Sequence, residues 1–202
     1  MAPRILGIAA SPRKDGNTDL LLREVLTAAS EAGADTNLVA ARDLAMRPCI
    51  ECNGCQKTGR CVLRDDMTGV FAQLLACDHL VFATPIFFTA VSAHAKMVID
   101  RCQCFWSLKY VLNKPLFEAP RSGRRGLFVG CCGWSQRWMF ECGRRTMKAL
   151  FNVLELDYAG ELLYHSIDAK GDILAHPTAL ADARAAGRAL ATGQPVASTP
   201  GG

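Results

Sequence analysis

The chain has 202 residues, enough for one domain that buries a full hydrophobic core without cross-links. Its formal charge is only +4 and its basic residues are scattered, so nucleic acid is not an expected partner. We interpret the short arginine pairs at residues 124–125 and 144–145 as solvated or helix-end side chains. The sequence shows no secretion signal and no apolar stretch long enough to span a bilayer, which predicts a cytoplasmic protein whose thiols stay reduced.

Short apolar runs alternate along the chain with stretches of helical periodicity. The apolar runs predict strands at residues 4–10, 36–41, 79–83 and 126–129 and within 154–162. Apolar residues at helical spacing predict helices that include residues 21–29, 70–75, 91–102, 139–150 and 178–191. Residues 103–123 show no clean period, and we interpret them as an irregular excursion that is a candidate cover of the active end.

Strands that alternate with helices describe a doubly wound α/β protein. At this length we predict a flavodoxin-like three-layer sandwich whose five-stranded parallel sheet has the order 2-1-3-4-5. We expect a single domain over residues 1–192 and a disordered tail over residues 193–202, which are rich in Gly, Pro, Ser and Thr. Ligands bind such sheets beyond the carboxyl ends of the strands, so the loops that leave that edge form the candidate site.

The loop between the first strand and the first helix carries candidate phosphate contacts: Ser11, Arg13, Asn17 and Thr18. Hydroxyls, a guanidinium and the free backbone amides of a helix N-terminus together suit one terminal phosphate. The chain lacks both the nucleoside triphosphate P-loop and the three-glycine dinucleotide fingerprint. We therefore predict a mononucleotide such as FMN. A simple helix cap by Asn17 or Thr18 is the alternative, but it leaves Arg13 unexplained.

Two further loops follow strands at the same edge of the predicted sheet. After the third strand, amides and aromatic surface for a flat ring are offered by Thr84, Pro85, Ile86, Phe87 and Phe88. After the fourth strand, Gly130 and Gly133 would let the backbone approach the other side of the ring. The two phenylalanines equally suit core or interface positions. The three tryptophans are candidate covers of the site, although packing is the commoner role of such residues.

Four cysteines lie close together at the spacing C-x2-C-x2-C-x5-C: Cys49, Cys52, Cys55 and Cys61. A tight run of this kind is typical of iron-sulfur clusters, whereas zinc knuckles are more often separated by a long spacer. Gly59 permits a bend that returns the fourth thiol to the same group. We predict one 4Fe-4S cluster. A structural zinc and a loop that binds nothing are the alternatives.

Five motifs occur in an order that resembles the iron-sulfur flavoproteins: residues 11–18, 49–61, 65–67 and 83–86, and the pattern Lys96-x-x-x-Asp100-Arg101. These proteins belong to the NADPH-dependent FMN reductase-like group, which has the flavodoxin fold. The resemblance covers roughly residues 4–165, and its specific part is the cysteine run, because flavin reductases without a cluster share the other motifs. Ala10 departs from the glycine that is usual in the family.

The resemblance implies FMN on the 11–18 and 84–88 loops, a 4Fe-4S cluster on the four cysteines, and a homodimer or homotetramer. Because the cysteine loop leaves the same end of the predicted sheet as the FMN loops, we predict an oxidoreductase that passes electrons between the cluster and FMN to oxygen, peroxide, a quinone or a protein partner such as ferredoxin. The second strand is an edge strand of the predicted order, so the alternative is a cluster that serves the FMN of a neighbouring subunit. NADPH and NADH are candidate donors, although no nicotinamide fingerprint is visible. The alternatives are an NAD(P)H-dependent FMN or quinone reductase without a functional cluster, and a non-enzymatic electron carrier or redox sensor that uses the cluster or Cys131 and Cys132.

Overall fold

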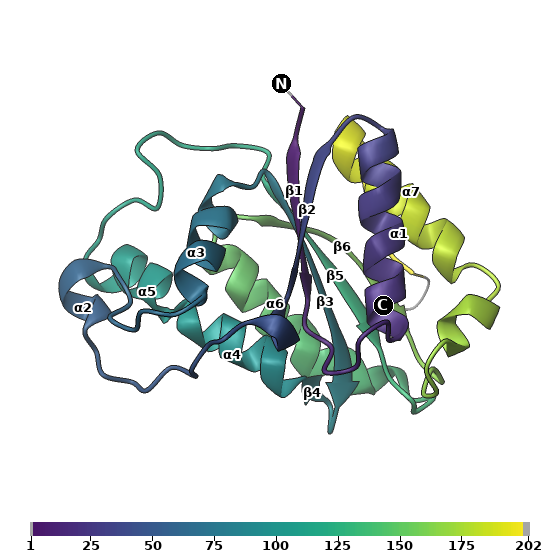
Figure 1. Cartoon of the computed structure of the whole chain (residues 1–202). Coiled ribbons are helices and arrows are strands. Elements are labelled where there is room, and N and C mark those ends of the chain that lie inside the picture. Colours follow the sequence, from purple (N-terminus) through teal and green to yellow (C-terminus); the bar gives the residue numbers. More distant parts are fainter. Residues whose placement is uncertain (1, 200–202) are drawn as a thin grey trace.

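A parallel sheet forms the centre of the computed structural model, which describes residues 2–199 (Figure 1). Neighbouring strands pair in the order β2 (Asp35–Ala40), β1 (Arg4–Ala9), β3 (His79–Phe87), β5 (Arg125–Cys131) and β6 (Asp157–Tyr164). The predicted flavodoxin-like fold and strand order are confirmed. β1, β3 and β5 are almost wholly buried, which explains why they stand out in the sequence as continuous apolar runs.

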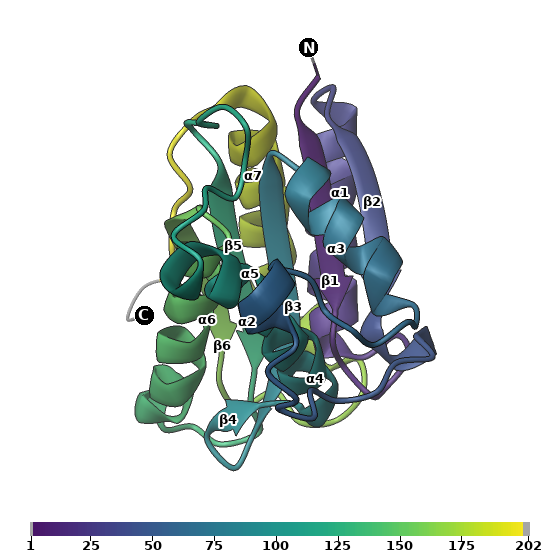
Figure 2. The same cartoon turned by 90° about the vertical axis from the view of Figure 1, so that its left-hand side faces the viewer.

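Helices cover both faces of the sheet (Figures 1 and 2). One face carries α1 (Asn17–Glu31) and α7 (Ala179–Thr192). The other face carries α3 (Met67–Ala76), α4 (Ala93–Arg101) and α6 (Glu141–Val153). Gly187 allows α7 to lie against α1, because a Cβ atom at this position would stand 2.1 Å from the Val25 carbonyl oxygen. Among the described residues, no helix combines the length and the apolar character needed to cross a membrane.

The remaining helical segments are short: η1 (Ala41–Asp43), α2 (Cys55–Thr58), α5 (Gln103–Trp106), η2 (Ser107–Val111), η3 (Arg137–Phe140) and η4 (Asp172–Ala175). The prediction of an irregular excursion over residues 103–123 is therefore wrong for its first half. α5 and η2 pack beside α2 instead of covering the strand ends, and a Cβ atom at Gly59 would stand 2.5 Å from Leu108 Cδ1. Elements of four or five residues are too short to show a helical period in the sequence.

β3 extends four residues beyond its predicted end at residue 83. It turns through Phe88 and Thr89, whose φ angles are +49° and +67°, into the two-residue antiparallel strand β4 (Ala90–Val91). Positive φ at both central residues is the geometry of a tight β-hairpin turn. The following helix starts later than predicted because Ser92 is its N-cap, and Ser92 Oγ accepts a hydrogen bond from Ala95 N at 3.2 Å.

The end of the described chain lies along the outer edge of β6. Ser198 Oγ accepts a hydrogen bond from Glu161 N at 3.2 Å, and Thr199 Oγ1 accepts one from Leu163 N at 3.1 Å. The disordered tail expected over residues 193–202 stays a prediction. Residues 200–202, which also belong to that predicted tail, lie outside the described residues. The single-domain boundary at residue 192 stays a prediction.

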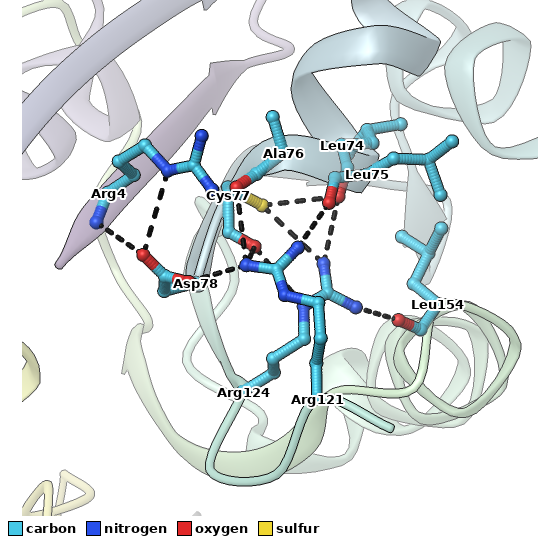
Figure 3. Close-up of polar contacts among 9 residues, drawn as sticks. All are labelled: Arg4, Leu74, Leu75, Ala76, Cys77, Asp78, Arg121, Arg124 and Leu154. Carbon is cyan, nitrogen blue, oxygen red and sulfur yellow. Dashed lines mark hydrogen bonds and ion pairs between the residues drawn. The ribbon is translucent and has the colours of Figure 1, made fainter. Parts of the chain in front are cut away.

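Arg124 and Arg121 bind the carbonyl groups at the end of α3 (Figure 3). Arg124 is buried, and it donates from Nε to Cys77 O at 3.2 Å, from Nη2 to Leu74 O at 2.9 Å and from Nη1 to Leu154 O beyond α6. Arg121 donates to Leu75 O at 2.5 Å. The last carbonyls of a helix lack intrahelical partners and carry partial negative charge, so both arginines stabilise helix ends. The helix-end interpretation of Arg124 is confirmed.

Arg124→Lys is expected to lower the free energy of unfolding by about 1.5 kcal/mol, because an ammonium group cannot reach all three carbonyls that the planar guanidinium binds. Urea unfolding followed by circular dichroism measures the change. Arg121→Lys is the matched control and should cost less, since its side chain is one-quarter exposed and water can replace the lost contacts. An equal loss in both variants would contradict the special role of Arg124.

Candidate functional site

A cavity of about 620 Å³ opens at the carboxyl ends of the central strands. Nine of the predicted cofactor contacts line it: Ser11, Arg13, Asn17, Thr18, Pro85, Ile86, Phe87, Phe88 and Gly133. The cavity lies where the chain leaving β1 and the chain leaving β3 pass to opposite faces of the sheet, which is the usual ligand position in this architecture. Its volume is within the range of pockets that hold cofactors.

Residues 11–18 fold tightly around the first turn of α1. Ser11 Oγ accepts a hydrogen bond from Arg13 N at 3.1 Å, and Gly16 N donates to Arg13 O at 3.1 Å. Gly16 occupies the N-cap position without a side chain, and a Cβ atom there would stand 3.0 Å from Arg13 O. The first amides of α1 therefore meet the cavity at the positive end of the helix dipole, beside the Arg13 guanidinium. This arrangement fits one terminal phosphate.

A buried ion pair supports the backbone of the 11–18 loop. Arg42 Nη1 lies 2.8 Å from Asp19 Oδ2 and donates to Ser11 O at 3.3 Å, while Asp15 N donates to Asp19 Oδ2 at 3.2 Å. The Asp19 side chain is only 2 % exposed, and this burial raises its pKa despite the neighbouring Arg42 charge. The pair links the end of β2 to the loop and restrains its backbone.

Asn17 has a structural role that the sequence did not predict. Its Nδ2 donates to Ala169 O at 2.9 Å, and its Oδ1 accepts from Gly171 N at 2.9 Å and from Ile173 N at 3.3 Å. The side chain thus joins α1 to the loop that follows β6, while its backbone amide stays at the helix N-terminus. Arg13 Nη1 contacts the same loop at Asp168 O, 3.2 Å away.

Two of the predicted cofactor contacts do not lie on the cavity. Thr84 is fully buried, and its hydroxyl accepts a hydrogen bond from Ser92 N at 3.1 Å and donates to Pro85 O at 3.0 Å. A Cβ atom at Gly130 would stand 2.9 Å from Leu163 Cδ2, so this glycine faces the core. Neither residue lines the strand-end cavity, so a contact of Thr84 or Gly130 with the cofactor stays a prediction.

Sequence reasoning missed the loop after β6, which supplies Ile167 and Asp168 to the cavity. Its position after the carboxyl end of a strand was the available signal. The cavity is also lined by four exposed aromatic side chains, two phenylalanines and two tryptophans. Their exposed fractions are 51 % for Phe87, 98 % for Phe88, 63 % for Trp134 and 54 % for Trp138. These four residues form an aromatic rim that is available to a flat ring.

Cys131 and Cys132 line the same cavity, but both are nearly fully buried. Burial raises the pKa of the Cys131 thiol, and it also raises the pKa of Cys132 although the backbone of Trp134 opposes this shift. The thiolate is the reactive form of cysteine, so both groups stay protonated and unreactive at neutral pH. The geometry therefore disfavours the interpretation of this pair as a redox sensor.

The four cysteines of the predicted cluster line a second cavity of about 430 Å³. Gly59 ends α2 in the left-handed conformation, with φ of +73°, and turns the chain back toward Cys61 as expected. Cys104 of α5 adds a fifth thiol to the wall. Within residues 2–199, no three Cys, His, Asp or Glu side chains are arranged to hold a single metal ion. The fit to an iron-sulfur cluster therefore rests on the four thiols and on the one cavity that they line.

The two cavities have no lining residue in common. The cysteine loop leaves the carboxyl end of β2, but it then crosses the helical layer to α2, which lies beside α5 and away from β4 (Figure 2). The cysteine loop therefore shares a sheet edge with the strand-end cavity only where the loop begins. Within one chain, the thiols and the aromatic rim occupy different regions.

The strand order and the strand-end cavity define the flavodoxin-like class of α/β proteins. Residues 3–154 match the NADPH-dependent FMN reductase family, and the chain belongs to that family. It is 39 % identical over 98 residues to an iron-sulfur flavoprotein of Methanocaldococcus jannaschii, covering 48 % of this chain and 51 % of that protein. It is 35 % identical over 106 residues to an iron-sulfur flavoprotein of Archaeoglobus fulgidus, covering 52 % and 54 %. The chain spans about half the length of the curated relatives it matches.

Solved structures share the fold at low sequence identity. An NAD(P)H:quinone oxidoreductase from Methanothermobacter marburgensis superposes with a TM-score of 0.69 at 15 % identity, covering 94 % of this chain and 98 % of that chain. An FMN-dependent NADH-azoreductase from Bacillus anthracis, solved with FMN, gives a TM-score of 0.62 at 15 % identity, covering 94 % and 99 %. These likenesses establish the flavodoxin-like architecture.

Proposed function

We propose that the chain is an iron-sulfur flavoprotein oxidoreductase with FMN at the strand ends and a 4Fe-4S cluster on Cys49, Cys52, Cys55 and Cys61. The observation that carries the proposal is the presence of two cavities, one at the phosphate loop and one lined by the four thiols. The names of the M. jannaschii and A. fulgidus relatives support the same pairing. When bound, FMN supplies one- and two-electron chemistry and the cluster supplies one-electron transfer.

In this proposal, the residues of the strand-end cavity bind FMN and orient its ring. Arg13 and the first amides of α1 hold the phosphate, and the backbone of residues 85–88 meets the edge of the flavin ring. The aromatic rim limits water and offers a stacking surface to a flat donor or acceptor. NADPH and NADH are candidate donors. The acceptor is oxygen, peroxide, a quinone or a protein partner such as ferredoxin.

The separation of the two cavities favours electron exchange between subunits over exchange within one chain. In a homodimer or homotetramer, the cysteine cavity of one copy can lie against the exposed aromatic rim of another. Phe88, almost fully exposed at the tip of its hairpin, is the side chain best placed to be covered by such a neighbour.

The test compares cluster-loaded protein with iron-free protein, both carrying FMN and prepared without oxygen. Iron, acid-labile sulfide and FMN are counted per chain, and the rate at which reduced flavin is reoxidised by oxygen or a quinone is then recorded. We expect removal of the cluster to change that rate, because the cluster exchanges electrons with the flavin. An unchanged rate would contradict the proposed electron path.

A second candidate function is an NAD(P)H-dependent FMN or quinone reductase whose cysteine loop does not serve the reaction. The family match favours it, since this family description names NADPH and FMN without a cluster. It predicts rapid reduction of bound FMN by NADPH or NADH in iron-free protein. Slow reduction by both nucleotides would exclude it.

A further inference from the structure

One buried arginine binds residues on both sides of the cysteine loop. Arg101, the last residue of α4, has a side chain without solvent exposure. Its Nη1 and Nη2 bind the two carboxylate oxygens of Asp65 at 2.6 and 3.0 Å, and Nη1 also donates to Arg47 O at 2.8 Å. Arg47 N donates to Asp65 Oδ2 at 3.1 Å. Because Arg47 precedes the four cysteines and Asp65 follows them, a single guanidinium joins both ends of the loop.

The same side chain lies on the wall of the cysteine cavity. Arg101 is the only basic residue among the described residues that line it, whereas Glu51 and Asp100 are acidic. Its Nε–H is buried and has no hydrogen-bond partner in the described part of the chain. Burial alone would lower the pKa of the guanidinium, but the bond to Asp65 and then the nearby Cys61 thiol leave it raised. Because Arg101 and the four thiols line the same cavity, a positive charge stands at the site that would hold the cluster.

We propose that Arg101 is a positioning residue for the iron-sulfur group, which it serves by holding the cysteine loop closed and by supplying an unpartnered Nε–H and a positive charge at the wall of the cysteine cavity. This inference rests on the proposed function. Deprotonated cysteines bring negative charge into the cavity, and an added electron brings more. A buried cation and a hydrogen bond to sulfur both stabilise the reduced form more than the oxidised form. Arg101 therefore raises the reduction potential of the group.

The experiment measures that potential by anaerobic titration, followed by visible absorption and electron paramagnetic resonance, with iron counted per chain. Arg101→Met should lower the potential by at least a tenfold change in the one-electron equilibrium, or about 59 mV. Asp65→Asn retains the Arg101 charge and removes its paired negative charge, so the potential should rise. Lys57→Met is the matched control, because it removes an exposed cation within the loop that water and salt already screen. Its shift should be smaller.

Opposite shifts in Arg101→Met and Asp65→Asn would support the proposal, since a purely structural role predicts loss of iron in both without opposite changes in potential. Equal shifts in Arg101→Met and Lys57→Met would overturn the role of Arg101 and leave the iron-sulfur site standing. If Arg101→Met does not fold, Asp65→Asn decides alone, and an unchanged or lowered potential would overturn the proposal. Wild-type protein without iron would instead overturn the proposed function.

Discussion

Cys52→Ala is expected to reduce the iron and acid-labile sulfide of the protein from about four each per chain to less than one, because it removes one of the four thiolates that usually hold a cubane cluster. Cys52 is the middle member of the tight C-x2-C-x2-C run, and all four cysteines of the loop line one cavity. The loop of the variant keeps only three of the four predicted ligands. Iron and sulfide analysis of protein purified without oxygen, with the visible spectrum of the same sample, measures the loss.

Two further variants decide whether this loss is specific. Cys142→Ala is the matched control, since Cys142 is an exposed thiol outside the cysteine cavity, and it should keep its full iron content. Cys104→Ala tests the fifth thiol on the wall, which lies on α5 and donates to Arg101 O at 3.5 Å, and we expect it to keep its iron too. Retention of iron in Cys52→Ala would contradict the cluster assignment. One zinc per chain in the wild type would favour a structural metal.

The central sheet could be predicted because its strands are buried on both faces. Such strands appear as unbroken apolar runs, and parallel pairing then limits the possible order. The extension of β3 could not be predicted in this way, because Pro85 normally interrupts a strand. Pro85 pairs with Cys131 at the last position of the β3–β5 ladder, where a missing amide hydrogen costs little.

The parts of the site that escaped prediction depend on contacts between distant segments. Asn17 binds Gly171, 154 residues away, so nothing in its own loop reveals that its side chain is already engaged. Arg101 is the last residue of an amphipathic helix, where an arginine is expected to be exposed. Its side chain is instead buried, because it binds Asp65 and the Arg47 carbonyl group. In both cases the sequence shows a polar side chain but does not show which distant residue it binds. The spacing of the four cysteines, in contrast, is a local signal, and the structure brings all four to one cavity.

Arg13→Glu should weaken FMN binding about 30-fold, equivalent to about 2 kcal/mol, while riboflavin binding stays unchanged. Arg13 is an exposed cation beside the first turn of α1, and the cavity that it lines also holds the predicted ring contacts. A glutamate at this position would place negative charge next to the flavin phosphate and remove a charge-assisted hydrogen bond. Riboflavin has no phosphate, so its affinity reports only on the ring contacts. Quenching of flavin fluorescence measures both dissociation constants.

The ratio of the two affinities separates a phosphate contact from a general disturbance of the loop. Arg13→Lys keeps the charge and should lose less than Arg13→Glu, because only the planar fork of the guanidinium is missing. Arg188→Glu makes the same change of charge at an exposed position on α7 and should leave both affinities unaltered. A parallel loss of FMN and riboflavin binding in Arg13→Glu would show that Arg13 supports the loop through its bond to Asp168 O instead of binding phosphate. An unchanged FMN affinity would remove Arg13 from the site and leave the phosphate to the amides of α1.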